Sequence, residues 1–99
     1  MARPRKCKMV YATPGATYFK PRAIPMTELE EVELTMEEFE AIRLIDKKGQ
    51  EQKEAAKKMK VSQPTLNRLL NSARGKIAEA LVEGKAIMIK GGAYSLKKR

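Results

Sequence analysis

The sequence predicts a mainly α-helical fold, in which a tri-helical helix-turn-helix is flanked by a small β-sheet. Three features predict it: a capped amphipathic segment at 36–48, two further helical segments that meet near Val61, and short apolar runs outside this region. The chain then divides into a basic, proline-containing arm with short strands (1–34), a helix-turn-helix domain (35–84), and a C-terminal strand with a basic tail (85–99).

The arm contains four of the five prolines and two short apolar runs, Met9 to Tyr11 and Thr17 to Phe19. We expect these runs to form strands of the small sheet, with Tyr11, Tyr18 and Phe19 packed on the domain. The following segment, 29–34, fits a strand and a helical turn equally well, because its apolar spacing matches neither period clearly.

The first helix, about 36–48, begins with the capping-box pattern of Thr35 and Glu38 and ends before Gly49. An apolar stripe of Met36, Phe39, Ile42 and Ile45, with Leu44 beside it, faces the core. The acidic residues at 37, 38 and 40 suit the helix start, where capping and solvation account for them.

A short second helix is expected at 51–59, with Ala55, Ala56 and Met59 facing inward. Ser62 caps a third helix, which tolerates Pro64 in its first turn and runs from 63 to about 83, before Gly84. Its inward stripe consists of Leu66, Leu70, Ala73, Ile77 and Ala80, widened by Leu69 and Leu81.

After the third helix, Ala86 to Ile89 predicts a strand that stops at the Gly91-Gly92 turn. The residues from Ser95 onward, with three basic residues at the end of the chain, are expected to form a frayed tail.

Composition limits the classes of function. The chain has 99 residues, one cysteine and no histidine, so an intramolecular disulfide is impossible and zinc or histidine-based sites lack their usual ligands. The longest apolar runs are four residues, whereas a membrane helix needs about 20. We therefore expect a cytoplasmic protein that is no enzyme, has no cofactor or metal, and does not contact membranes.

Charge is segregated along the chain. Residues 1–22 hold six basic residues and no acid, residues 23–54 hold four basic and ten acidic residues, and residues 55–99 hold eleven basic and two acidic residues. The net charge of +9 is thus concentrated in two segments. Such segregation is typical of a basic face directed at a polyanion, most commonly nucleic acid.

Residues 52–71 fit the helix-turn-helix template. That template requires apolar residues at its positions 4, 8, 10, 15 and 18 and a small residue at position 5, where the two helices approach closely. The apolar positions are Ala55, Met59, Val61, Leu66 and Leu69, and the small residue is Ala56. This match predicts that the third helix enters the major groove of double-stranded DNA.

The predicted DNA contacts follow from the exposed face of the third helix, where Asn and Gln suit adenine edges and Arg suits guanine or phosphate. This face comprises Ser62, Gln63, Pro64, Thr65, Asn67, Arg68, Asn71 and Arg74. Backbone contacts are expected from Lys57, Lys58 and Lys60. Arg3, Arg5 and Lys6 suit the minor groove or the backbone. Cys7 has no partner base and suggests no catalysis.

The predicted function is sequence-specific binding of double-stranded DNA, as a transcriptional regulator. Two alternatives remain. A protein-interaction module would contact RNA polymerase or a regulator through the acidic residues at 28–40, and an RNA-binding protein would use the same basic charge without any RNA motif. The oligomeric state stays open, and a homodimer would read two half-sites.

The ordered motifs ARPRK, TYFKPRAIP, ELEEVELT, EEFEAIRL, QKEAAKKMKVSQPT, ARGKIAEALVEGKAI and KGG resemble an uncharacterised family of small bacterial and archaeal proteins. The resemblance covers about residues 2–94. It implies predicted DNA-binding proteins whose helix-turn-helix is similar to region 4 of RNA polymerase sigma factors, with no known target.

Three positions depart from the family pattern. The family usually has Ser where Glu51 stands, Gly where Lys60 stands, and often Arg where Gln63 stands. If residue 60 adopts a left-handed backbone conformation, Lys in place of Gly lowers the free energy of unfolding by about 1–2 kcal/mol. The change at Gln63 implies a different base preference if that residue touches a base.

Overall fold

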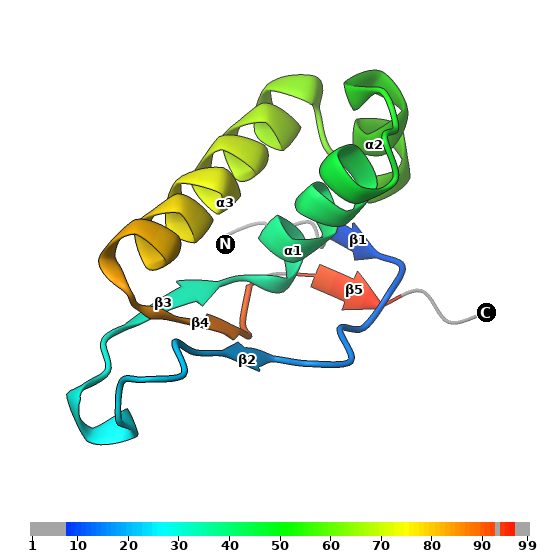
Figure 1. Cartoon of the computed structure of the whole chain (residues 1–99). Helices are drawn as coiled ribbons and strands as arrows, with labels where there is room; N and C mark the ends of the chain where they lie inside the picture. The colour runs from blue at the N-terminus through cyan, green and yellow to red at the C-terminus, as the bar shows by residue number, and fades with distance from the viewer. Residues whose placement is uncertain (1–7, 93, 97–99) are drawn as a thin grey trace, which may run out of the picture.

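The helices lie on one side of the strands in the computed structural model of the chain, which describes residues 8–92 and 94–96 (Figure 1). The chain order is β1 (Lys8–Val10), β2 (Tyr18–Phe19), the 3-10 turn η1 (Met26–Glu28), β3 (Glu31–Leu34), α1 (Met36–Ile42), the π-helical segment η2 (Arg43–Lys47), α2 (Gln52–Met59), α3 (Gln63–Glu83), β4 (Ala86–Ile89) and β5 (Tyr94–Leu96). The mainly helical class with a small sheet is confirmed.

The principal sheet has the order β2-β4-β3, with β4 in the centre. β3 runs parallel to β4, from Glu31 opposite Ala86 to Leu34 opposite Ile89, while β2 runs antiparallel to β4. The helices therefore form the crossover that a parallel pair of strands requires. The sheet combines an arm strand with the 86–89 strand, as expected, and adds β3.

β3 resolves the ambiguity of segment 29–34 in favour of a strand. Its residues alternate between exposed and buried, with Val32 and Leu34 buried and Glu31 and Glu33 exposed. This period of two is the pattern of a strand with one solvated face. The decisive factor is pairing with β4, more than fifty residues later in the chain.

The expectation of a frayed tail from Ser95 onward was wrong for its first residues. β5 pairs in parallel with β1, with Met9 opposite Ser95 and Val10 opposite Leu96. Backbone hydrogen bonds between β1 and β5 place these residues in a two-stranded sheet. The basic composition of the C-terminal segment gave no indication of this pairing. Residues 97–99 lie outside the described residues.

The first helix continues past Ile42 as a π-helical segment, in which the amide of Lys48 donates to the carbonyl of Arg43 at 2.9 Å. Ala41 and Leu44 are fully or almost fully buried, whereas Phe39, Ile42 and Ile45 are half-buried. Met36 of the predicted stripe is buried and its other members pack against the core, while Ala41, which the stripe did not include, is buried as well. The capping box of Thr35 and Glu38 and the stop at Gly49 are confirmed.

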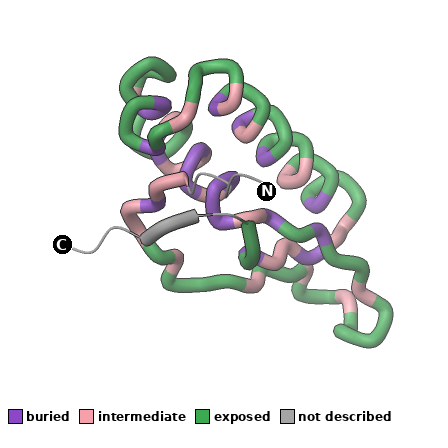
Figure 2. The backbone as a smooth tube through the Cα atoms, turned by 180° about the vertical axis from the view of Figure 1, so that it is seen from behind, coloured by how far each residue is buried: buried purple, intermediate pink, exposed green. Residues whose placement is uncertain are grey.

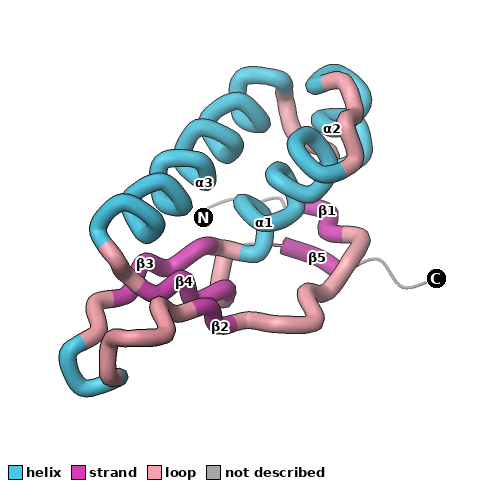
Figure 3. Tube along the Cα trace, in the orientation of Figure 1, coloured by secondary structure: helices cyan, strands magenta, loops and turns pink. Residues whose placement is uncertain are grey.

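A short turn of Lys60 to Ser62 joins α2 to α3 (Figure 3). Lys60 adopts a left-handed conformation (φ 58°, ψ 45°). Its amide donates to the carbonyl of Lys57, and the amide of Val61 donates to the carbonyl of Ala56. This is the Schellman pattern, which normally places glycine at the left-handed position. Glu51, at the start of α2, provides no side-chain cap.

α3 has the predicted bounds, with Ser62 as its cap and Gly84 in a left-handed conformation at its end. Leu66, Leu70, Ala73 and Ala80 are buried, and Ile77 is half-buried. Leu81 was expected to widen this stripe, but its side chain is 76% exposed. Among the described residues, Leu81 only borders an open hollow beside Phe19 and Gly84, so apolar character alone mispredicted its burial.

The core consists of two clusters of buried residues. Buried residues are purple in Figure 2. One cluster holds α1, α2 and α3 together and contains Ala41, Leu44, Ala55, Ala56, Met59, Leu66 and Leu70. The other joins α1 and α3 to the strands and contains Val10, Leu34, Met36, Ala73 and Ile89. Ile42 packs against both clusters and connects them. Within the described residues, no helix has the length and apolarity needed to cross a membrane.

The left-handed Lys60 yields a stability prediction. Lys60→Gly should raise the free energy of unfolding by about 1 kcal/mol, because glycine adopts this conformation without a Cβ clash. The greater conformational entropy of glycine in the unfolded chain offsets part of the gain. For a domain of this size the melting temperature should rise by roughly 4–8 °C. Lys60→Ala is the control, since it removes the same charge and keeps the strain. Equal melting temperatures for the two variants would contradict this account.

Candidate nucleic-acid interface

The first three turns of α3 present a polar face to solvent. Gln63, Asn67 and Asn71 are exposed, whereas Leu66 and Leu70 on the opposite side are completely buried. The separation follows from helical spacing, because residues three or four apart share one face. The structure thus brings the three predicted amide side chains together on one accessible surface.

The start of α3 is held by a short chain of hydrogen bonds. The Ser62 hydroxyl accepts from the amide of Thr65 at 3.2 Å and donates to the Thr65 hydroxyl at 2.9 Å. Arg68 donates in turn to the Thr65 hydroxyl at 3.3 Å. Pro64 occupies the first turn, where its missing amide breaks no helical bond. These hydrogen bonds orient the side chains of Ser62, Thr65 and Arg68 relative to one another.

The surroundings of this face are strongly basic. No acidic residue occurs between Glu54 and Glu79, a stretch that contains Lys57, Lys58, Lys60, Arg68, Arg74 and Lys76. Within residues 8–92, the first four of these form no ion pair, whereas Arg74 and Lys76 do. Lys57, Lys58, Lys60 and Arg68 are also exposed. We refer to these four residues as the free cations.

Arg74 differs from the other predicted contacts. Its guanidinium donates two hydrogen bonds to Asp46, at 3.1 and 2.7 Å, and so ties α3 to the end of the first helix. The Arg74 guanidinium lowers the pKa of Asp46, and Asp46 raises the pKa of Arg74 by the same hydrogen bonds. Arg74 is half-exposed, but its donors already have a partner, Asp46, which lies 28 residues earlier and which no local pattern predicts.

The predicted contacts Arg3, Arg5 and Lys6 lie outside the described residues, as does Cys7. The arm that follows them is attached to the helices by Tyr11. Its hydroxyl donates to the carbonyl of Lys58 at 2.9 Å, and its amide donates to Glu40 at 3.0 Å. Tyr11 therefore packs on the domain as expected, directly behind the basic residues of α2. Tyr18 is half-buried, while Phe19 is 53% exposed.

Capping accounts for Glu38 as expected, but solvation does not account for the acidic residues of α1, because all three are buried. Glu40 is fully buried and accepts two hydrogen bonds from Arg43, at 2.8 and 2.9 Å, besides that of Tyr11. A buried carboxylate needs such compensation, since burial without partners is very unfavourable. Pairing with Glu40 raises the pKa of Arg43.

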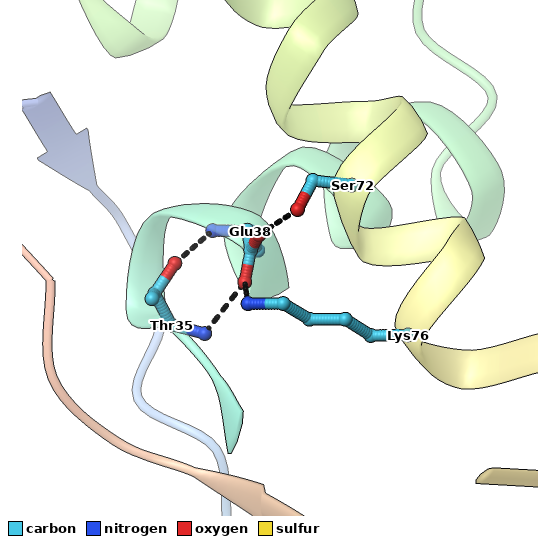
Figure 4. Close-up of polar contacts among 4 residues, drawn as sticks. All are labelled: Thr35, Glu38, Ser72 and Lys76. Carbon is cyan, nitrogen blue, oxygen red and sulfur yellow. Dashed lines mark hydrogen bonds and ion pairs between the residues drawn. The ribbon is translucent and has the colours of Figure 1, made fainter. Parts of the chain in front are cut away.

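Glu38 links the start of α1 to the middle of α3 (Figure 4). It accepts from the Thr35 amide at 2.9 Å, from the Lys76 ammonium at 2.7 Å, and from the Ser72 hydroxyl. Burial alone would raise the pKa of Glu38, but these donors outweigh it, and the pKa lies below its usual value. The capping box therefore also fixes the orientation of α3.

Glu37 is paired through one oxygen only. Its Oε2 lies 3.2 Å from the Lys8 ammonium, while Oε1 has no hydrogen-bond partner in the part of the chain that the structure describes. The Gly92 backbone (φ 95°) crosses close to this carboxylate, and a Cβ at position 92 would collide with it. The glycine turn therefore belongs to the packing of α1, beyond its role in ending β4.

The burial of Glu37, Glu38 and Glu40 reduces the acidic surface that was considered for protein contact at 28–40. The exposed members are Glu28, Glu30, Glu31 and Glu33. Of these, Glu31 accepts a hydrogen bond of 2.6 Å from the Tyr18 hydroxyl, which raises the pKa of Tyr18. What remains is a narrow acidic edge on and before β3.

Comparison with known proteins places the chain in a family. Residues 1–97 match a family described as "Protein of unknown function DUF134". The chain belongs to this family. This result confirms the expected membership of an uncharacterised family of bacterial proteins. No solved structure matches the chain significantly.

Two relatives illustrate the similarity. A "UPF0251 protein" of Moorella thermoacetica is 59% identical over 96 residues, which cover 97% of this chain and 64% of the relative. A "UPF0251 protein" of Thermoanaerobacter pseudethanolicus is 57% identical over 94 residues, which cover 95% of this chain and 80% of the relative. The chain thus spans somewhat less than two thirds of the Moorella protein, and neither name states a function.

The environment of Glu38 predicts a pH-dependent stability. Glu38→Gln should lower the free energy of unfolding near neutral pH by about 1.5–3 kcal/mol, because it weakens charged hydrogen bonds to Lys76 and Ser72. Since the folded pKa is depressed, the advantage of the wild type is complete above the unfolded pKa of glutamate and is lost as pH falls through the folded pKa.

Urea unfolding at a series of pH values measures this difference. Glu54→Gln is the matched control, because Glu54 is exposed on α2. A gap between wild type and Glu38→Gln that stays constant down to strongly acidic pH would disprove the assigned role of the carboxylate.

Proposed function

We propose that this protein binds double-stranded DNA in a sequence-specific manner and acts as a transcriptional regulator. The observation that carries the proposal is the amide face of α3, which lies beside the free cations and opposite a fully buried leucine pair. A helix of about 10–12 Å diameter with such a face suits a major groove about 12 Å wide.

The packing of α2 and α3 supports this proposal. Of the six template positions, Ala55, Ala56, Met59 and Leu66 are buried, while Val61 and Leu69 are half-buried against the same cluster. Both helices are thereby anchored on α1, and the outer side of α3 stays accessible. This is the arrangement expected of a helix-turn-helix, including that of sigma region 4.

The chemistry of the face suits base recognition. Gln63, Asn67 and Asn71 each carry a donor and an acceptor, the pair that adenine presents in the major groove. Arg68, exposed between them and held at Thr65, can donate to guanine or phosphate. We assign sequence preference to these four side chains.

The backbone contacts have a separate origin. Lys57, Lys58 and Lys60 lie on α2 and in the turn, where they flank the start of α3. The first amides of α3 and its helix dipole also favour a phosphate near Ser62. These groups would supply affinity and register but no choice of sequence.

Removal of the base-reading side chains tests the proposal. Asn67→Ala and Arg68→Ala should each weaken binding to the preferred duplex by about 1–3 kcal/mol and narrow the difference between preferred and scrambled DNA. Both residues are exposed, so the fold should tolerate the changes. Fluorescence anisotropy titrations provide the measurement. Unchanged affinity and unchanged preference in both variants would refute the site.

A lysine variant tests the backbone assignment separately. Lys57→Ala should weaken binding to all duplexes alike and reduce the slope of log affinity against log salt by about 0.9, the value for one lost phosphate contact. Lys90→Ala is the control, since Lys90 is exposed just after β4, outside the proposed site. If both lysine variants change the slope equally, attraction is general and not located on α2. Preference for single-stranded or A-form nucleic acid would favour RNA binding instead.

A further inference from the structure

The last turn of α3 exposes large apolar side chains. Leu81 is 76% exposed and Val82 is 84% exposed, and Phe19 on β2 is 53% exposed. Isolated apolar residues on a surface are ordinary, but Phe19 and Leu81 line one hollow together, and Val82 follows Leu81 in the same turn of α3. We call this region the α3-end surface, defined by Phe19, Leu81 and Val82.

Two hollows meet at Phe19. One, of about 300 Å³, is bounded by Phe19, Pro21, Ala80, Leu81, Gly84 and Ile87. The other, of about 260 Å³, is bounded by apolar side chains only, including Phe39, Ile77 and Ile87. Each is large enough to receive a leucine-sized side chain. The α3-end surface therefore combines exposed apolar side chains with hollows that could receive such side chains from another molecule.

Charged residues of both signs lie on the elements that form this surface, and Lys20 and Lys85 line the hollow beside Phe19 and Leu81. On α3, Glu79 and Glu83 share a single partner, Lys85, at 2.6 and 3.2 Å, which leaves one negative charge in excess. Beyond β2, Lys20 and Arg22 are exposed and form no ion pair within residues 8–92. A two-fold axis can place these carboxylates of each copy against these two cations of the other.

We propose that the α3-end surface binds a second copy of this chain in a two-fold symmetric dimer. Leu81 and Val82 of each copy enter the hollow beside Phe19 of the other, and Glu79 and Glu83 approach Lys20 and Arg22 of the other. Such self-complementarity is what an isologous interface requires, because every contact occurs twice. An apolar centre with a charged rim is also the usual anatomy of a protein interface.

The position of this surface has a consequence for DNA recognition. That consequence rests on the proposed function, whereas the dimer itself does not. Leu81 is fourteen residues beyond Asn67 on α3, or about 21 Å along the helix. Two helices that meet at their ends therefore place their recognition faces up to about 40 Å apart, and closer when the axes are inclined. Half-sites one DNA turn apart are separated by about 34–36 Å.

Sedimentation equilibrium of the full chain across a wide concentration range tests the pairing. The wild type should show a reversible monomer–dimer equilibrium. Leu81→Lys should raise the dimer dissociation constant at least about tenfold, because it places an unpaired charge at the apolar centre. Gln52→Lys adds the same charge at an exposed position on α2 and should leave the equilibrium unchanged.

Circular dichroism shows whether Leu81→Lys is folded. If it is not, a second pair of variants tests the dimer through its charged residues. Glu83→Arg should weaken the dimer, and Arg22→Glu in the same chain should restore it. A wild type that stays monomeric at every concentration, or variants that dimerise as the wild type does, would overturn the proposal and assign the surface to another partner. A dimer that forms without any DNA binding would refute the proposed function alone.

Discussion

The structure depends on one apolar contact, the packing of Leu66 and Leu70 of α3 against Ala41 and Leu44 of the first helix. Burial of a leucine side chain contributes about 1.5–3 kcal/mol, so this contact is a large part of a small domain's stability. It determines which side of α3 faces inward and therefore which side is left for a ligand. The small Ala55 and Ala56 allow α2 to approach the same cluster.

Ion pairs add to this packing, because carboxylates of the acidic segment neutralise some of the Lys and Arg side chains and, in the described part of the chain, leave others unpaired. The acidic segment does not form a surface opposite the basic one. Instead Glu37, Glu38, Glu40 and Asp46 pair with Lys8, Lys76, Arg43 and Arg74. These pairs hold the arm, α1 and α3 together. Among the basic residues from 57 to 76, they engage Arg74 and Lys76 and leave the four free cations, on α2, in the turn and at the start of α3, without an ion pair within residues 8–92. The positive character of the proposed interface thus results partly from where the carboxylates are buried.

Local signals predicted the helices and the polar face of α3, because caps, glycines and helical spacing act over a few residues. Ser62, Gly84 and the capping box of Thr35 needed no distant information. Distant partners explain what was missed. The contacts of Glu38 with Ser72 and Lys76 join residues more than thirty apart, and β5 depends on pairing with β1. The exposure of Leu81 likewise depends on which elements cover α3, which no local pattern encodes.

Selection from a random pool of duplex DNA is the experiment we would do first on the proposal that α3 recognises a DNA sequence. The selected duplex should then be titrated against a scrambled one at several salt concentrations. The account predicts an enriched motif and a preference that persists as salt rises, because base contacts are independent of counterion release. No enriched motif, with binding to all sequences that weakens equally and steeply with salt, would contradict it.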